Sequence, residues 1–265
     1  MLWGYALELV RVGAAGVAFA LQPLSVAAQA VSDPDPFHIE ATVGAMYSTD
    51  ARARGVLVRP RWQVAADIEL ERGALYAGTE HGVGFKVPSL STTTLGIGID
   101  YRSGRQESAD AIYRGLGSVH GTLVSASYIE WTPFGPALTL YGNLSVAATR
   151  QHTTTYKAGT RGGAPITEGL IAFVDASATG ADSRYMQTFY GVSAAQSSAS
   201  GLELHSARAG LIDYTALTGF LIDVYPRWQI VASVGRLVYS GVLTSSPVIQ
   251  RRSYPLALLA TSTSF

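Results

Sequence analysis

Residues 58–70 read VRPRWQVAADIEL, and the side chains at the even positions of this stretch are apolar. The odd positions carry Arg59, Arg61, Gln63, Ala65, Asp67 and Glu69. Residues 138–149, LTLYGNLSVAAT, alternate in the same way. A period of two puts every apolar side chain of an extended strand on one face. These stretches therefore predict strands of a sheet with one apolar and one polar face.

Three features favour a transmembrane β-barrel over a soluble sandwich. The alternating stretches run to 12 or 13 residues, and a tilted bilayer crossing needs about 9–11. The polar face is rich in Gly, Ser, Thr and Arg, and the whole chain has only two lysines, Lys86 and Lys157. Aromatic residues near the expected strand ends predict two interfacial girdles. These are Tyr47, Tyr76, Tyr101, Trp131, Tyr225, Trp228 and Tyr239. Because backbone groups in hydrocarbon all need partners, a closed barrel is the spanning β-structure.

The predicted fold is an all-β, antiparallel transmembrane barrel of 10–12 strands, forming a single domain over residues 31–265. Strands are expected at 37–47, 56–70, 74–84, 93–102, 118–131, 136–149, 166–178, 210–224, 227–240 and 255–265, with a weaker one at 152–162. Single-chain bacterial barrels have an even number of strands. Twelve strands place the short turns at 132–135 and 225–227 at the same end, so twelve is favoured.

Residues 1–30 are predicted to be a cleaved signal peptide. Arg11 precedes an apolar stretch at 12–26, and Ala28-Gln29-Ala30 has the small-x-small pattern of a cleavage site. An exported barrel belongs in the outer membrane of a Gram-negative bacterium. The formal net charge of zero gives no footprint for nucleic acid. The absence of cysteine excludes disulfides and thiolate zinc sites.

No pattern in the chain predicts catalysis, a cofactor or a metal site, so a non-enzymatic protein is expected. The five histidines do not have metal-ligand spacing. His205-Ser206 is the one hydrolase-like pair, but adjacent residues of a strand point to opposite faces. Charged residues on the polar face predict the lumen lining: Arg59, Arg61, Asp67, Glu69, Asp100 and Arg102. They form either the constriction of a pore or a salt-bridged packed lumen, and the narrow barrel favours the packed lumen.

Residues 181–193 read ADSRYMQTFYGVS, and Ser200-Gly201-Leu202 and Ser246-Pro247-Val248-Ile249 follow. Upstream stand Gly104-Arg105 and Arg114-Gly115-Leu116-Gly117. This order and spacing resembles the MipA/OmpV family of outer-membrane proteins, the MltA-interacting proteins. The positions that carry the resemblance are Arg105, Arg114, Gly115, Leu116, Gly117, Asp182, Tyr185, Met186, Phe189, Tyr190, Gly191, Ser200, Gly201, Ser246 and Pro247.

The resemblance implies an outer-membrane scaffold that docks murein-synthesising and murein-hydrolysing enzymes. Its partners would be outer-membrane lipid, a murein transglycosylase and a penicillin-binding protein. Two alternatives stay open: a narrow channel for small solutes, and a surface adhesin acting through the loop 179–209. Steady currents across planar bilayers would favour the channel. For the loop, the aromatic residues Tyr185, Phe189 and Tyr190 are expected to tuck into the barrel mouth as a structural clamp rather than to bind a ligand.

Overall fold

A computed structural model describes residues 38–48, 61–87, 91–147 and 153–264. The predicted signal peptide and Arg59 lie outside these residues, and for Arg61 only the backbone is described. No helix among the described residues is long and apolar enough to cross a membrane.

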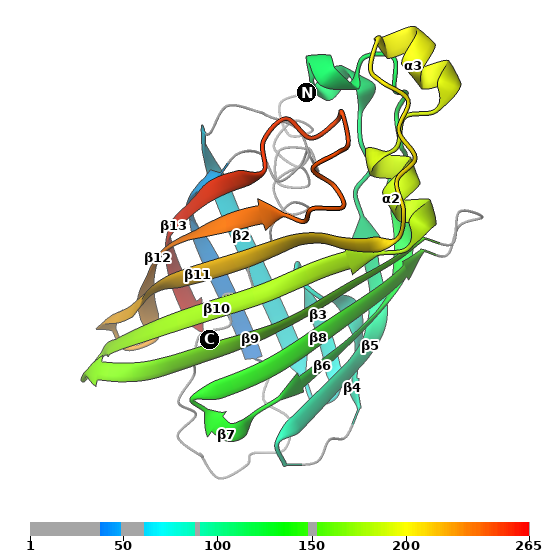
Figure 1. Ribbon diagram of the computed structural model, residues 1–265. Coiled ribbons are helices and arrows are strands. Elements are labelled where there is room, and N and C mark those ends of the chain that lie inside the picture. Colours follow the sequence, from blue (N-terminus) through cyan, green and yellow to red (C-terminus); the bar gives the residue numbers. More distant parts are fainter. Residues whose placement is uncertain (1–37, 49–60, 88–90, 148–152, 265) are drawn as a thin grey trace, which may run out of the picture.

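Twelve antiparallel strands form a closed barrel, in the order β1-β13-β12-β11-β10-β9-β8-β6-β5-β4-β3-β2 (Figure 1). The strands are β1 (His38–Ser48), β2 (Arg61–Arg72), β3 (Leu75–Gly78), β4 (Gly82–Val87), β5 (Thr93–Arg102), β6 (Thr122–Trp131), β8 (Leu138–Ala147), β9 (Thr154–Thr167), β10 (Leu170–Ala181), β11 (Gly210–Tyr225), β12 (Trp228–Tyr239) and β13 (Ser253–Ser264). A short strand, β7 (Pro133–Pro136), lies in the turn between β6 and β8. The predicted barrel of twelve strands is confirmed.

The two ends of the barrel differ. Short turns at 73–74, 132–137, 168–169 and 226–227 lie at the end where β13 finishes, which we call the turn end. The longer connections 103–121, 182–209 and 240–252 lie at the opposite end, the loop end. The loop end carries two 3₁₀ turns, Glu107–Ala109 and Ala111–Tyr113, and the helices α2 (Ser183–Tyr190) and α3 (Ala194–Ser200).

The twelfth strand comes from the segment 74–87. The sequence predicts one strand at 74–84, whereas the structure has the hairpin β3–β4, whose strands have four and six residues. The chain reverses at residues 79–81, and Gly82 adopts φ 71, a left-handed conformation that glycine adopts readily. The weak segment at 152–162 is a full strand, β9.

The outward face of the wall is apolar, as predicted. On β5, for example, Ile97, Ile99 and Tyr101 are each more than half exposed. Exposed Tyr101 and exposed Trp131 and Trp228 mark the two edges of the apolar band. Two residues predicted for the girdles are inside instead. Tyr76 is 2% exposed in the lumen, and Tyr239 packs against the buried loop residues.

The closing seam joins the first and last strands. Glu40 of β1 lies opposite Ser264 of β13, and the Thr42 hydroxyl donates to Ser262 Oγ at 2.9 Å. A Cβ on Gly44 would overlap Ala260 and the carbonyl oxygen of Leu259. The seam therefore leaves no room for a side chain at position 44.

The seam gives the first prediction. Gly44→Ala should lower the free energy of unfolding by about 1–3 kcal/mol, because an added methyl in a packed interior forces backbone shifts. Gly142→Ala is the matched control, since its Cβ would meet its nearest neighbour, Ile129 Cγ2, at an ordinary 3.4 Å, and it should change stability by less than about 0.5 kcal/mol. Both effects are measured by urea titration, with the folded protein followed as the gel band that shifts on heating. Equal urea midpoints for Gly44→Ala and the wild type would contradict a tight seam.

Candidate functional site

The loop end is organised around Asp182, which follows the last residue of β10. Its carboxylate accepts hydrogen bonds from the backbone N–H of Tyr185 at 2.7 Å and of Thr154 at 2.6 Å. The first bond caps the N-terminus of α2, and the second ties that cap to the start of β9. The helix is thereby fixed on the rim of the barrel wall.

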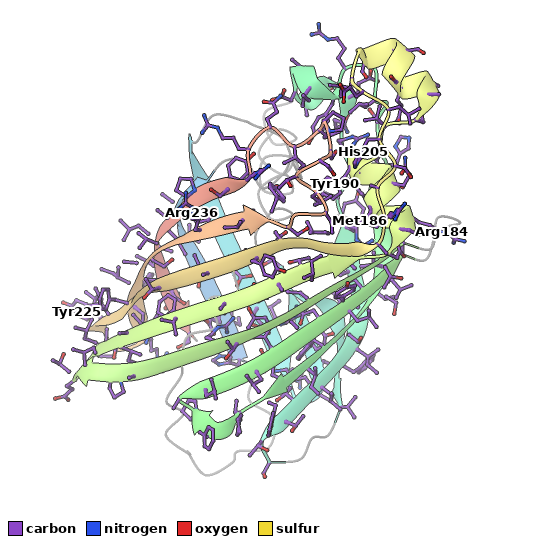
Figure 2. The ribbon with its side chains drawn as sticks, in the orientation of Figure 1. Arg184, Met186, Tyr190, His205, Tyr225 and Arg236 are labelled. Carbon is purple, nitrogen blue, oxygen red and sulfur yellow. The ribbon has the colours of Figure 1, made fainter. Side chains whose placement is uncertain are left out.

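The buried face of α2 forms a hydrophobic core at the barrel mouth. Tyr185, Met186, Phe189 and Tyr190 are at most 5% exposed. They pack with Ile212 at the top of β11 and with Leu243 from the loop 240–252. The Arg102 guanidinium of β5 lies 5.3 Å from the centre of the Tyr185 ring. The aromatic residues thus lie at the mouth, where the sequence placed them, and Figure 2 labels Tyr190 and the neighbouring Met186.

A second buried cluster joins all three long loops. It contains Tyr113 and Leu116 from the first loop, Val192 from the second and Val248 from the third. Leu116 also accepts a hydrogen bond from Gln196 Nε2 at 2.6 Å. Gln196 belongs to the capping box of α3, in which Ser193 and Gln196 satisfy each other's backbone N–H groups.

Arg105 is the central polar residue between these loops. Its guanidinium donates to the carbonyl oxygen of Phe189 at 3.0 Å and lies 5.1 Å from the centre of the Tyr113 ring. A longer bond of 3.5 Å reaches Gly117. Burial lowers the pKa of Arg105 from its ordinary value, whereas nearby Tyr113 and Glu107 raise it. The side chain therefore holds the first loop against the end of α2.

The third loop is tied to α2 by Ser246. Its hydroxyl donates to the carbonyl oxygen of Tyr190 at 2.6 Å and accepts from the N–H of Val248. The loops 103–121, 182–209 and 240–252 thus form one unit, which we call the loop clamp. Most of the residues that carry the family resemblance lie inside it or in its turns. Arg114, in contrast, is exposed, and its part in the resemblance has no structural explanation here.

Three glycines among the residues of the family resemblance also have a structural role in the clamp. Gly115 and Gly117 adopt φ 83 and 74, and Gly201 ends α3 with φ 76. A Cβ on Gly115 would also lie 2.6 Å from the backbone of residues 199 and 200. These positions need glycine for the turn itself, so their pattern is explained without a bound ligand.

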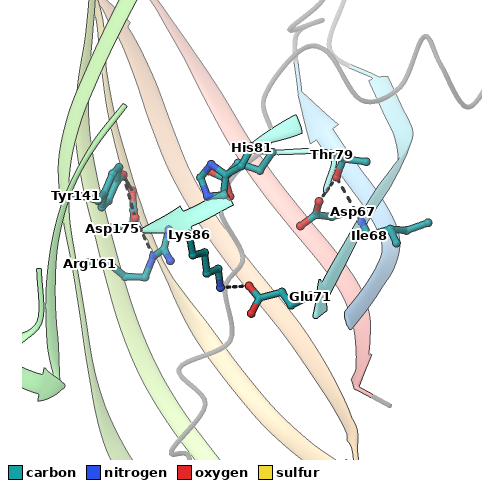
Figure 3. Close-up of polar contacts among 10 residues, drawn as sticks. Asp67, Ile68, Glu71, Thr79, His81, Lys86, Tyr141, Arg161 and Asp175 are labelled. Carbon is teal, nitrogen blue, oxygen red and sulfur yellow. Dashed lines mark hydrogen bonds and ion pairs between the residues drawn. The ribbon is translucent and has the colours of Figure 1, made fainter. Parts of the chain in front are cut away.

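The lumen is polar on the side formed by β2 to β9. Arg161 Nε donates to Asp175 at 3.2 Å, and the Tyr141 hydroxyl donates to the same carboxylate at 3.0 Å (Figure 3). Lys86 pairs with Glu71, also drawn in Figure 3. Arg161 and Lys86 thus each have an acidic partner on a neighbouring or nearby strand.

The tip of the β3–β4 hairpin adds to this polar filling. The His81 ring stacks on Tyr128 of β6, with centroids 4.2 Å apart and planes 17° apart, and Tyr76 meets both rings edge-on. Glu80, whose side chain is 12% exposed, is within electrostatic range of Lys157 and Arg161 on β9. Figure 3 shows His81 among the other lumen side chains. The hairpin pairs only with residues 69–72 of β2 and 95–99 of β5, in the turn-end half of the wall, and its tip side chains lie in the lumen.

The opposite side of the lumen is apolar. Phe173, Leu221, Val231, Leu258 and Ala260 of β10 to β13 form a buried cluster, with Ile171 packed against it. The inward face of these strands is nevertheless mixed, because Asp175, Thr215 and Ser233 are buried beside the cluster. On β2, in contrast, the inward residues nearest the turn end are the acidic Asp67, Glu69 and Glu71.

Of the predicted lumen residues, Asp67, Glu69, Asp100 and Arg102 lie on the inward face of their strands. Thr79 donates to Asp67, and Arg102 donates to Thr153 and to Thr155, at 3.1 and 2.9 Å. They do not form one constriction, because Arg102 belongs to the rim and Glu69 to the turn-end half of β2. The sequence prediction missed Lys86, Lys157 and Arg161. The last two lie on β9, whose glycines and threonines weaken its alternation.

His205 and Ser206 do not form a catalytic pair in the structure. His205 exchanges backbone hydrogen bonds with Val192 in an isolated antiparallel bridge, and Ser206 is exposed. In the described part of the chain, no hydrogen bond joins the imidazole to the Ser206 hydroxyl. The groups that a hydrolase would need are therefore not assembled at this position.

A closed wall with an apolar outer band and polar side chains in its lumen defines an integral β-barrel of the outer-membrane class. The chain belongs to the MipA family, because its residues 40–265 match the family described as MltA-interacting protein MipA. Such a barrel resides in the outer membrane of a Gram-negative bacterium.

Comparison with solved structures finds outer-membrane barrels of low similarity. An outer-membrane channel from Pseudomonas putida F1 shares 9% identity and a TM-score of 0.41, over 89% of this chain and 97% of the other. OmpT of Vibrio cholerae shares 6% identity and a TM-score of 0.38, over 87% and 99%. Neisserial surface protein A shares 8% identity and a TM-score of 0.27, over 86% and 97%. Among curated proteins, none matches the chain significantly.

The clamp gives the second prediction. Arg105→Lys should make the loop 182–209 about tenfold more sensitive to limited proteolysis, because lysine cannot reproduce the forked, charge-assisted bonds of arginine. The barrel strands should stay protected. Arg114→Lys is the matched control and should behave like the wild type, because Arg114 is exposed and lies in the loop 103–121, like Arg105. Equal cleavage of all three proteins would show that Arg105 does not hold the clamp closed.

Proposed function

We propose that this barrel is a non-enzymatic platform that docks a murein transglycosylase through its turn end. The turn end then faces the periplasm, where murein lies, and the loop clamp faces the cell exterior. The family description, MltA-interacting protein, supports the class of partner. A penicillin-binding protein is proposed to join through the transglycosylase.

The observation that carries the proposal is a pair of unusually exposed aromatic side chains at the turn end. Phe134 in β7 and Tyr225 at the end of β11 are each 74% exposed. The girdle residues beside them in the chain, Trp131 and Trp228, are 46% and 47% exposed. Exposed aromatic side chains are enriched among the residues that dominate binding energy at protein interfaces.

Both aromatic residues stand on fixed turns. Thr132, next to β7, donates its N–H to the carbonyl of Thr92 at 2.8 Å, and Gly135 closes the turn on Thr132 at 3.1 Å. Arg227, two residues after Tyr225, is the one non-glycine residue with positive φ among the described residues, at 74°. Its carbonyl accepts from Ser264 at 3.3 Å. Rigid turns reduce the ordering cost of binding, which suits a docking surface.

The rest of the molecule supports a platform over the two alternatives. A channel needs a continuous water path, whereas the lumen holds the tip of the β3–β4 hairpin on one side and a buried apolar cluster on the other. An adhesin needs loop side chains free to bind, whereas the main aromatic residues of the loop 182–209 are buried in the clamp. The turn end keeps its large apolar side chains free.

Binding to a purified murein transglycosylase of the MltA class tests the proposal. The double variant Phe134→Ala/Tyr225→Ala should bind at least about tenfold more weakly, since two interface aromatics are each worth roughly 1–2 kcal/mol or more. Leu204→Ala is the control, because Leu204 is a 65% exposed apolar residue at the loop end. Heat modifiability confirms that each variant is folded. No binding by the wild type, or equal binding by the double variant, would refute the proposal.

A further inference from the structure

One charged residue interrupts the apolar outer band. Arg236 of β12 is exposed and points outward, between the exposed Val234 and Val238 of the same strand. Its register partners are Ala216 on β11 and Pro255 on β13, both exposed and apolar. Among the described strand residues, the only other charged side chain on the outward face is Arg72, the last residue of β2 at the turn end. A charged side chain in a lipid-facing surface is uncommon and calls for a partner.

The height of Arg236 places its guanidinium near the lipid headgroups of the loop-end leaflet. Val238, two residues further along β12, pairs with the outward aromatic Tyr214 of β11. The Cα of Arg236 therefore lies about 7 Å closer to the turn end than the level of Tyr214. An arginine side chain can extend toward the interface while its stem stays in the apolar layer. Near an interface, a lipid-facing arginine costs only about 0–1 kcal/mol, which a single anionic partner offsets.

The protein itself does not supply that partner among the described residues. Arg236 has no ion pair or hydrogen bond there, and β11, β12 and β13 have no acidic residue on their outward face. The same fact argues against a second copy of the chain as the partner, since these strands offer no carboxylate to face an arginine across a dimer interface. The counter-charge has to come from the lipid.

Two more arginines stand above Arg236 on the same strand pair. Arg251 and Arg252, both exposed, lead into β13, and the carbonyl of Arg252 accepts from the N–H of Tyr239 at 2.8 Å. Pro255 is the register partner of Arg236, and Arg252 lies three residues from Pro255 toward the loop end. The two levels are therefore about 10 Å apart along the strand. The β12–β13 hairpin therefore presents positive charge both inside the lipid layer and just above it.

We propose that the outward face of the β12–β13 hairpin binds the phosphate groups of the lipid A part of lipopolysaccharide, with Arg236 as the membrane-level contact and Arg251 and Arg252 above it. The orientation is taken from the proposed function, in which the loop end faces outward. Arginine suits this role, because its planar guanidinium makes two parallel charge-assisted bonds to phosphate. Below Arg236, the outward side chains of this strand pair are apolar, so an acyl chain can lie against them; they are Ala232, Val234, Ala257 and Leu259.

The test is a titration of the folded barrel in detergent with bisphosphorylated lipid A. Arg236→Gln should raise the dissociation constant about tenfold, which is the loss expected for one charge-assisted contact. Arg236→Lys keeps the charge, so its dissociation constant should lie between those of Arg236→Gln and the wild type. Arg184→Gln is the matched control, because it removes one exposed arginine from the same end. Figure 2 shows Arg184 at α2 and Arg236 on β12, apart from each other in this view.

The source of the phosphate is separated by three further probes. Lipid A with its phosphates removed should bind the wild type and Arg236→Gln equally. Inorganic phosphate at millimolar concentration should not compete, and phosphatidylglycerol should not distinguish the two proteins. Equal affinity of wild type and Arg236→Gln for bisphosphorylated lipid A would overturn the proposal, and so would an equal effect of the substitution on phosphatidylglycerol. A change in oligomeric state without a change in lipid affinity would also overturn it and would indicate a protein partner. None of these results depends on docking of the transglycosylase at the turn end.

Discussion

The pairing of backbone polar groups between neighbouring strands of the wall is the constraint on which the rest of the structure depends. In hydrocarbon, an unpaired N–H or carbonyl has no water with which to form a hydrogen bond, so the sheet has to close on itself. Closure falls on the seam between β1 and β13, where Gly44 lies against Ala260 and Thr42 bonds to Ser262. Once the wall is closed, the inward side chains share a narrow interior, and they either pair or pack. The ion pair of Arg161 with Asp175 and the apolar cluster around Phe173 are the two solutions on opposite sides.

The wall, the loop clamp and the turn end are parts of the molecule with separate tasks. The clamp ties its loops together through hydrogen bonds of Asp182, Arg105 and Ser246 and buries its aromatic side chains. The wall meets lipid, with Arg236 as its charged exception near the loop end. The turn end presents Phe134 and Tyr225 on short, fixed turns. The proposed platform for a murein transglycosylase needs this last feature, and it does not need a path for solutes through the lumen.

The wall could be predicted from the sequence because its physical cause is local: alternation within each strand decides which side chains meet lipid. Local alternation does not say which apolar residue faces inward, so Tyr76 and Tyr239 were wrongly placed in the girdles. The hairpin at 75–87 was missed as two strands, because four and six residues are too short to show a period. The signature residues of the clamp were recognised, but their contacts were not, since Arg105 meets Phe189 across 84 positions of sequence. The sequence alone does not single out Arg236. Its position in an apolar, lipid-facing surface becomes evident only from the sheet register, which places Ala216 and Pro255 beside it.

The central claim, an outer-membrane barrel with its clamp outside and its docking turns in the periplasm, is tested most directly by labelling single cysteines in living cells. The chain has no cysteine, so Leu204→Cys and Phe134→Cys each provide one site, at opposite ends and both well exposed. A maleimide that does not cross the outer membrane should label Leu204→Cys in intact cells and Phe134→Cys only after that membrane is permeabilised. Labelling of Phe134→Cys alone in intact cells would contradict the orientation, and labelling of both would contradict a barrel that separates the two ends.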